Sequence, residues 1–296
     1  TACTIADRDY GIKALGTMAH SWVQMFPSEY DAFKKYAEIY PENCVLLVDT
    51  YNVLKSGVPN AIKVFKEMKP AKMGIRIDSG DMTYLTKKAR KMLDDAGLTD
   101  CQITVSNSLD EFIIRDVILE GAQIDAFGVG ERLITAKSEA VFGGVYKLVA
   151  LEKDGVTIPK IKVSENVEKI TNPGFKTLYR LTDKTSGKVL ADVMTVDGET
   201  IEEVDGYEIF DPKAVWKRKK LYNFEAKNLR VQLFDKGKNV HKPREIEEIK
   251  VYCKNQIDSL WDEMLRFDNP QTYYVDLSQK LYDMKQNLIK ELHLEN

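Results

Sequence analysis

The sequence has little of what marks several common protein classes. Its 296 residues include only four cysteines, 17 glycines and nine prolines, a composition outside the disulfide-rich, collagen-like and low-complexity ranges. No C-x-x-C pair occurs, and no cysteine has a histidine at metal-ligand spacing, so buried thiols are expected rather than a zinc site. We therefore predict an ordinary globular protein of a reducing compartment, the cytoplasm.

An excess of positive charge is also missing. The formal net charge is -3 and the isoelectric point is about 5.8, whereas proteins that bind nucleic acid along its phosphates are usually basic. No apolar run approaches the roughly 20 residues that cross a bilayer, and no basic and then apolar leader is present. We expect neither nucleic acid nor a membrane as partner. Because the chain starts at Thr1 on a small apolar segment, we expect a fragment or a processed chain.

Residues 44 to 130 repeat one arrangement of apolar run, polar turn and helical segment. The runs cover residues 44–48, 73–77, 102–105 and 124–127, and their spacing of about 25 residues is typical of parallel strands joined by helices. A strand at 12–15 and a helix at about 28–40 are expected to extend the pattern toward the N-terminus. The sequence thus predicts an α/β fold.

The pattern changes after Gly144. Short alternating segments with glycine turns predict a mostly antiparallel β region to about residue 233. Two apolar stripes at helical spacing, 246–260 and 281–292, predict helices that each bury one face. We therefore expect an α/β domain at 1–150, a β-rich domain at 151–235 and packed C-terminal helices at 236–296.

Polar residues and glycines follow the predicted strands. In parallel α/β folds, ligands bind at the loops after the carboxyl ends of strands. Five such loops therefore predict one shared ligand site. They are Gly16-Thr17-Met18-Ala19-His20-Ser21, Asp49-Thr50-Tyr51-Asn52, Asp78-Ser79-Gly80-Asp81, Ser106-Asn107-Ser108 and Gly128-Val129-Gly130.

Three of these features indicate specific chemistry, and each has a plainer alternative. Asp78 and Asp81 flank a Ser-Gly turn beside Arg76, which suits sugar hydroxyls or a Mg²⁺ that carries a diphosphate. The alternative is that Asp78 or Ser79 only caps the helix that begins near residue 82. The glycines at 128–130 and 143–144 could present N–H groups to a phosphate or could simply form tight turns.

An imidazole at one of these loops is the third feature. His20 could act as a nucleophile toward phosphate or as an acid–base group, and its alternative is a structural histidine.

In their order along the chain, these motifs resemble those of the nicotinate phosphoribosyltransferase family. The resemblance implies an irregular, TIM-like α/β barrel, present in part, with a second domain that is mostly antiparallel β plus α. The matching segments are GTMAHSW (16–22), VDTY (48–51), GIRIDSGD (74–81), SNSLDE (106–111), FGVG (127–130), GGVYKL (143–148), NPGFK (172–176), DPKAVWK (211–217), NP (269–270) and VDLS (275–278).

The resemblance also implies an activity. The enzyme would form nicotinate mononucleotide and diphosphate from nicotinic acid and phosphoribosyl pyrophosphate, with ATP hydrolysis and Mg²⁺, as a homodimer. His20 would be the histidine that ATP phosphorylates. Arg76 would contact nicotinate or ribose, and Asp78 and Asp81 the ribose and the Mg²⁺-bound diphosphate.

The resemblance assigns substrate contacts to further residues. Asp49 would border the base and nucleotide pocket, and Lys147 would approach the diphosphate, in a neighbouring subunit. The 5-phosphate contacts would be Ser106, Asn107, Gly128, Gly130 and Gly144, and the remaining expected substrate-binding residues are Ala2, Ser21, Tyr51, Ser79, Gly80 and Gly143.

Two departures keep alternatives open. Glu131 follows Gly130 where the family usually has threonine, and the N-terminal aromatic residue and Gly-Thr-Arg-Arg motif of the family are not in the chain. A non-catalytic phosphate-binding fragment that needs a missing N-terminal chain is thus one alternative. A relative that uses nicotinamide or quinolinate is the other, although Ala2, where nicotinamide enzymes have aspartate, favours the acid.

Overall fold

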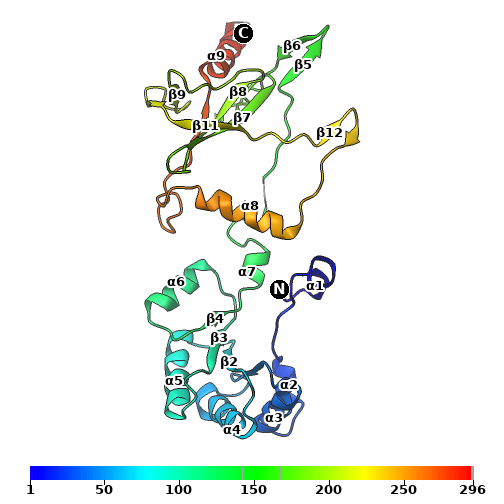
Figure 1. Cartoon of the computed structure of the whole chain (residues 1–296), viewed down its shortest axis with the longest axis vertical. Helices are drawn as coiled ribbons and strands as arrows, with labels where there is room; N and C mark the ends of the chain where they lie inside the picture. The colour runs from blue at the N-terminus through cyan, green and yellow to red at the C-terminus, as the bar shows by residue number, and fades with distance from the viewer. Residues whose placement is uncertain (142, 167–168, 295–296) are drawn as a thin grey trace. The chain divides into compact units, whose positions relative to one another are not determined.

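The chain forms two compact units, Thr1–Gly143 and Gly144–Asn296. The computed structural model describes residues 1–141, 143–166 and 169–294 (Figure 1). None of the described helices is long and apolar enough to span a bilayer. The predicted boundary at residue 150 and the further division at 235 stay predictions.

The first unit is built around a four-stranded parallel sheet. Its strand order is β1-β2-β3-β4, so the predicted parallel strands are confirmed. The strands are β1 (Cys44–Leu47), β2 (Met73–Ile77), β3 (Gln102–Val105) and β4 (Ala126–Phe127). The helices are α1 (Thr4–Tyr10), α2 (His20–Gln24), α3 (Glu29–Ile39), the π-helix η1 (Val53–Gly57), α4 (Val58–Met68), α5 (Met82–Asp95), α6 (Glu111–Leu119) and α7 (Glu131–Ile134).

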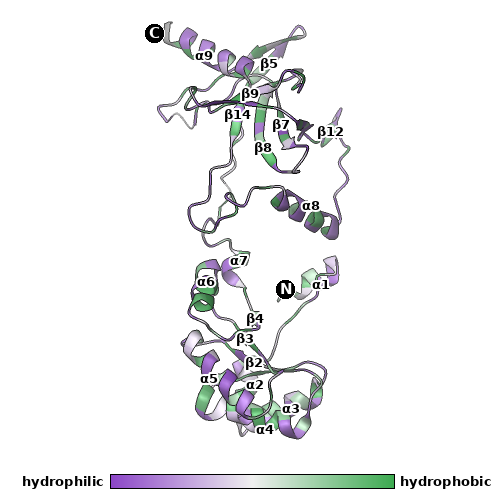
Figure 2. Cartoon of the chain, turned by 60° about the vertical axis from the view of Figure 1, so that its left-hand side comes forward, coloured by the Kyte–Doolittle hydropathy of each residue, from purple (hydrophilic) through white to green (hydrophobic). Residues whose placement is uncertain are grey.

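Amphipathic helices supply the core of this unit. Helices α3, α4 and α5 contact the sheet and place apolar side chains such as Phe33, Phe65 and Leu93 in fully buried positions. Burial of each such side chain stabilises the fold by roughly 1.5–3 kcal/mol. In Figure 2 the green, hydrophobic stretches of these helices alternate with purple, hydrophilic ones, as expected for helices with one buried face.

The predicted strand at 12–15 is wrong. Residues 12–19 are neither helix nor strand, and Ile12 and Leu15 are 39% and 63% exposed. A short apolar run forms a strand only where a neighbouring strand pairs with it. In the described part of the first unit, the sheet begins at β1.

One glycine fixes the approach of η1 to the sheet. A Cβ on Gly57 would lie 1.9 Å from the carbonyl oxygen of Val48, the residue that precedes Asp49. That distance is far below van der Waals contact, so only glycine fits at this position.

The second unit has a mixed sheet of order β11-β7-β8-β14, antiparallel except for the parallel β14–β8 pair. The structure as a whole is thus mixed α/β. The strands are β5 (Ala150–Lys153), β6 (Val156–Pro159), β7 (Lys176–Asp183), β8 (Val189–Val196), β9 (Tyr207–Phe210), β10 (Arg218–Leu221), β11 (Phe224–Asn228), β12 (Phe234–Asp235), β13 (Lys238–Asn239) and β14 (Val275–Leu277). The helices are α8 (Ile246–Asp258) and α9 (Gln279–Leu294).

The two C-terminal helices differ in burial. Leu281 of α9 is fully buried, as its stripe predicts. Helix α8 has no buried residue, and Ile257 in its stripe is 47% exposed, so the prediction that α8 buries one face is wrong for this chain. The apolar spacing and the Glu245–Glu248 capping box explain why it is helical, but its described contact with β7, from Arg180 to Gln256, is polar. Cys253 of this helix is exposed, as is Cys3, so the predicted burial of the thiols is confirmed only for Cys44 and Cys101.

Candidate functional site

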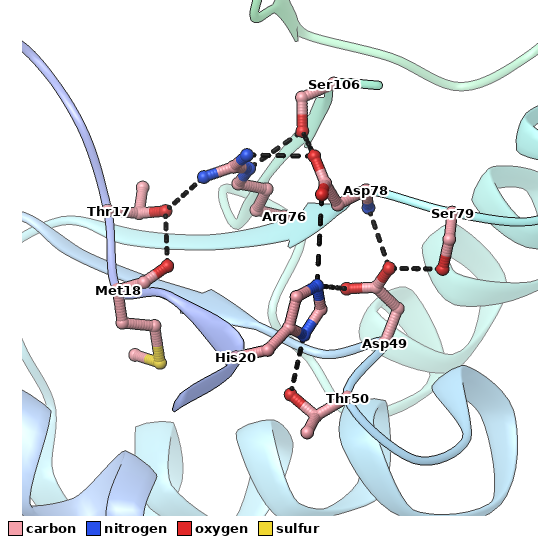
Figure 3. Close-up of polar contacts among 9 residues, drawn as sticks. All are labelled: Thr17, Met18, His20, Asp49, Thr50, Arg76, Asp78, Ser79 and Ser106. Atoms are coloured by element: carbon pink, nitrogen blue, oxygen red, sulfur yellow. Dashed lines mark hydrogen bonds and ion pairs between the residues drawn. The ribbon is translucent and has the colours of Figure 1, made fainter. Parts of the chain in front are cut away.

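The carboxyl ends of three neighbouring strands bring polar side chains together in the first unit. Asp49 follows β1, Asp78 follows β2 and Ser106 follows β3. His20, the first residue of α2, lies beside them. Figure 3 shows these side chains pointing toward one another, linked by a continuous set of polar contacts. The expected convergence of four of the five loops is thus found.

Arg76 is the second-to-last residue of β2 and lies at the centre of this cluster. Its Nε donates to Ser106 Oγ at 2.8 Å, and its two terminal nitrogens donate to Thr17 Oγ1 at 2.9 Å and to Asp78 Oδ1 at 2.8 Å. The planar guanidinium suits such a fork of three acceptors, which a lysine ammonium would not reproduce.

Asp78 is held ionised by its neighbours. Burial acts to raise the pKa of its carboxyl group, but hydrogen bonds from Ser106 and Arg76 and the positive charge of Arg76 lower that pKa below its usual value. The carboxylate oxygen Oδ2 faces the imidazole of His20, with 3.8 Å between Oδ2 and Nε2.

His20 is fixed on one side and open on the other. Its Nδ1 lies 3.1 Å from Thr50 Oγ1, and its Nε2 lies 3.9 Å from Asp49 Oδ1. The side chain is 40% exposed, so a substrate can reach the ring. An accessible imidazole oriented by a hydroxyl, with carboxylates near its second nitrogen, can take up a phosphoryl group or transfer a proton.

Asp49 is the most buried acid of the cluster. Its side chain is 1% exposed, and its Oδ2 accepts from the backbone N–H of Asp78 at 3.1 Å and from Ser79 Oγ at 2.5 Å. Its Oδ1 is buried without a hydrogen-bond partner. A buried carboxylate oxygen with no donor is costly, which favours a cation beside it.

Helix capping falls on Asp81 rather than on Asp78 or Ser79. Asp81 accepts the backbone N–H of Tyr84 at 2.9 Å at the start of α5. Within the described residues, no group of three or more Asp, Glu, His or Cys side chains could hold a metal ion by itself. A Mg²⁺ ion would need substrate oxygens to complete its ligands, as it usually does.

The glycines at this rim differ in their surroundings. A Cβ on Gly128 would lie 3.2 Å from Ser106 Cβ, and its N–H donates to the Val105 carbonyl at 2.8 Å. Gly80 turns the chain with a φ of 88°, which L side chains rarely adopt. Gly130 precedes α7, and Asn107 also has a positive φ, 89°.

A cavity of about 410 Å³ adjoins the cluster. Asp49, Tyr51, Ser79 and Gly80 line it together with residues of η1 and α5. Its volume is within the usual range for a small-molecule site. Tyr51, with 61% exposure, is therefore at a cavity wall rather than in the core.

Other predicted residues are not joined to the cluster by any contact in the described structure. Ala2 is exposed near the start of the first unit, and Gly143 ends that unit. Gly144 and Lys147 belong to the second unit, and their roles stay predictions. Ser21 lies next to His20 in α2.

Sequence reasoning omitted two hydroxyls that the structure brings into the cluster. Thr17 accepts from Arg76, and Thr50 contacts His20. Their position was a usable signal, because each lies within a strand-end loop that already contained a predicted site residue.

Comparisons with known proteins agree with this geometry. Residues 175–285 match the family model for the nicotinate phosphoribosyltransferase C-terminal domain. The nicotinate phosphoribosyltransferase of Bacillus subtilis is 43% identical over 289 residues, 97% of this chain and 59% of that protein. The corresponding protein of Dictyostelium discoideum is 34% identical over 88% of this chain and 46% of its own length.

Solved structures support the fold. The crystal structure of human nicotinic acid phosphoribosyltransferase aligns with a TM-score of 0.75 at 22% identity, over 97% of this chain and 64% of that one. A nicotinate-nucleotide pyrophosphorylase from Pyrococcus furiosus aligns with a TM-score of 0.57 at 20% identity, over 87% and 58% of the two chains. The chain spans about half to three fifths of the curated relatives named above, and it belongs to the nicotinate phosphoribosyltransferase family.

Proposed function

We propose that the chain carries the catalytic cluster of a cytoplasmic nicotinate phosphoribosyltransferase, which joins nicotinic acid to the ribose 5-phosphate of phosphoribosyl pyrophosphate. The observation that carries this proposal is the meeting of His20, Arg76 and Asp78 from α2 and the end of β2. The name of the Bacillus subtilis relative gives the reaction class. The parallel sheet would form part of an α/β barrel, and the enzyme would be a homodimer.

Glycosyl transfer from a pyrophosphate passes through a transition state with positive charge on the ribose and negative charge on the leaving diphosphate. Asp78 is ionised and beside the open rim, so its carboxylate would stabilise the ribose side. Arg76 would orient that carboxylate and approach nicotinate or ribose. Mg²⁺ bound with the diphosphate would supply charge neutralisation for the leaving group, and Asp78 and the unpartnered oxygen of Asp49 are the acids best placed to face it.

His20 would receive the γ-phosphoryl group of ATP. A ring nitrogen would form the bond to phosphorus as the bond to the ADP oxygen breaks, and water would later cleave the phosphohistidine to inorganic phosphate. Thr50 holds the ring through Nδ1, which orients Nε2 toward Asp49 and Asp78. The remaining predicted residues would act as substrate contacts: Ala2, Ser21, Tyr51, Ser79, Gly80, Asp81, Ser106, Asn107, Gly128, Gly130, Gly143, Gly144 and Lys147.

The experiment compares the chain and its His20→Ala variant with nicotinic acid and phosphoribosyl pyrophosphate, with and without ATP. Nicotinate mononucleotide is measured. We expect ATP to stimulate the parent protein and not the variant, and label from the γ-phosphate of ATP to appear only on the parent. Unchanged ATP stimulation in the variant would refute the phosphohistidine role. Binding of phosphoribosyl pyrophosphate without any turnover would support a non-catalytic fragment, and competition among nicotinic acid, nicotinamide and quinolinate tests the choice of base.

A further inference from the structure

The second unit contains a cavity of about 730 Å³ that the proposed reaction does not use. Its walls come from β8, β14, α9, the segment before β7 and residues 212–213 after β9, and they are mostly apolar. Three residues of α9, Tyr282, Lys285 and Ile289, face it at helical spacing. The volume is within the range of small-molecule sites.

Lys285 introduces a positive charge into this apolar cavity. The residue is half-buried, and burial lowers the pKa of its ammonium group. Its Nζ donates to Asn172 Oδ1 at 2.9 Å. Over residues 1–141, 143–166 and 169–294, no carboxylate forms an ion pair with Lys285. An ammonium has three donors, so two remain for a ligand.

Asn172 adds a second donor beside the ammonium. Its Nδ2 faces Met194 Sδ at 3.7 Å, and a thioether is a weak acceptor. The bond from Lys285 Nζ to the amide oxygen of Asn172 keeps the two side chains together. One ligand carboxylate could therefore accept from both Lys285 Nζ and Asn172 Nδ2. A desolvated positive charge with no anionic neighbour is unfavourable by itself, so an anionic ligand would relieve that cost.

The walls decide which kind of anion fits. A phosphate or polyphosphate has several charged oxygens that each need a donor. Lys213, Tyr282 and Gln286 also line the cavity and carry donors, but Leu277 and Ile289 gain only from a ligand with an apolar body, which inorganic phosphate lacks. A carboxylate on an apolar body matches both the donors and the apolar part of the wall.

We propose that this cavity binds a small organic monocarboxylate, whose carboxylate pairs with Lys285 and Asn172 and whose apolar body lies against Met194 and the neighbouring aliphatic side chains. The proposal does not depend on the reaction proposed for the first unit. It assigns a second, separate ligand site to the β-rich unit.

The test uses the complete chain with methyl-labelled methionine, so that the Met194 resonance reports binding in the cavity by NMR. Hexanoate is the probe, and hexanol of the same chain length is the uncharged control. A charge-assisted pair predicts that hexanoate binds about ten- to a hundredfold more tightly than hexanol. Inorganic phosphate is titrated in parallel and should leave the Met194 resonance unchanged.

Two lysine substitutions on the same helix complete the test. Lys285→Met keeps the length and the apolar stem but removes the charge, and the hexanoate preference should disappear. Removal of an uncompensated, half-buried charge should leave the unfolding temperature unchanged or raise it, which separates a binding defect from misfolding. Lys290→Met, at an exposed position of α9 that does not line the cavity, should retain the preference.

Several results would overturn the proposal. These are equal binding of hexanoate and hexanol, a Met194 shift with phosphate as large as that with hexanoate, no saturable shift with hexanoate, or a hexanoate preference that survives in Lys285→Met.

Discussion

Removal of the Ser106 hydroxyl is the sharpest test of the polar cluster. The Ser106 side chain is buried and bridges two strands, since its Oγ accepts from Arg76 and donates to Asp78. Ser106→Ala leaves both charged groups without that partner and creates almost no cavity. The variant therefore isolates the contribution of one hydroxyl to the site.

The expected loss is about 2 kcal/mol of unfolding free energy. A hydrogen bond to a charged group contributes about 1.5–3 kcal/mol, but Arg76 and Asp78 are 25% and 30% exposed. Water can replace part of each bond, so the two losses do not simply add. In a unit of this size, that corresponds to a decrease of about 4–8 °C in unfolding temperature.

The pH dependence gives an independent readout. A lowered pKa means that Asp78 contributes stability above its unfolded value of about 3.9, and that this contribution is lost as pH falls through the folded pKa. Without the Ser106 bond the pKa of Asp78 should rise toward its unfolded value, so the variant should lose less stability than the parent as pH falls. The difference in unfolding free energy between the two proteins should therefore be largest near neutral pH and should disappear in acid.

Calorimetry and circular dichroism over a range of pH measure both effects. Ser106→Thr, which keeps a hydroxyl, should lie closer to the parent protein. Ser108→Ala, at an exposed position two residues away, should be indistinguishable from it. If Ser106→Ala unfolds at the parent's temperature with the same pH dependence, the hydroxyl does not bridge the two charges and the described cluster is incorrect.

Three further predictions concern other acids and one arginine. Asp81→Ala should lower the unfolding free energy, measured by chemical denaturation, by about 1 kcal/mol, because the α5 cap is lost. Asp81→Asn keeps a capping oxygen and should keep that stability, and it should lose turnover only if the carboxylate meets the substrate. Burial raises the pKa of Asp276 to about 6, so folding favours the neutral carboxyl group. The folded protein is therefore most stable, as far as Asp276 is concerned, in acid, and it loses unfolding free energy as pH rises toward 6. Asp276→Asn should thus be more stable than the parent by roughly 3 kcal/mol above that pH, with the gap closing below about pH 4 in thermal melts. Arg180 forms a bidentate pair with Asp192, which is 5% exposed, and Arg180→Met should cost about 3–5 kcal/mol in urea unfolding because it leaves a buried charge unpaired.

The sequence predicted the parallel sheet and the polar residues at its carboxyl edge because the local and global signals agree there. Each run is apolar enough to be a buried strand, and each is followed by a loop whose polar residues have no place in a core. The carboxyl ends of parallel strands meet at one edge, so Asp49, Asp78 and Ser106 could be grouped without coordinates.

The failures come from contacts that a linear pattern does not contain. The run at 12–15 has strand-like residues but no partner strand in the described first unit. The stripe of α8 predicts a buried face, but burial requires an element packed against that face, whereas the contact from Arg180 of β7 is polar and leaves α8 without a buried residue. Which acid caps α5 depends on backbone geometry, and Asp78, Ser79 and Asp81 are all acceptable by residue type.

The contact of Gly57 with Val48 has a consequence for motion at the site. Val48 and Gly57 flank the loop that carries Asp49, Thr50 and Tyr51, and their backbones are in contact. The two ends of this loop are therefore held together. Asp49 lies next to this contact, and its carboxylate also accepts from the backbone N–H of Asp78 and from Ser79. A ligand in the adjoining cavity would therefore meet this carboxylate in a fixed position, 3.9 Å from Nε2 of His20.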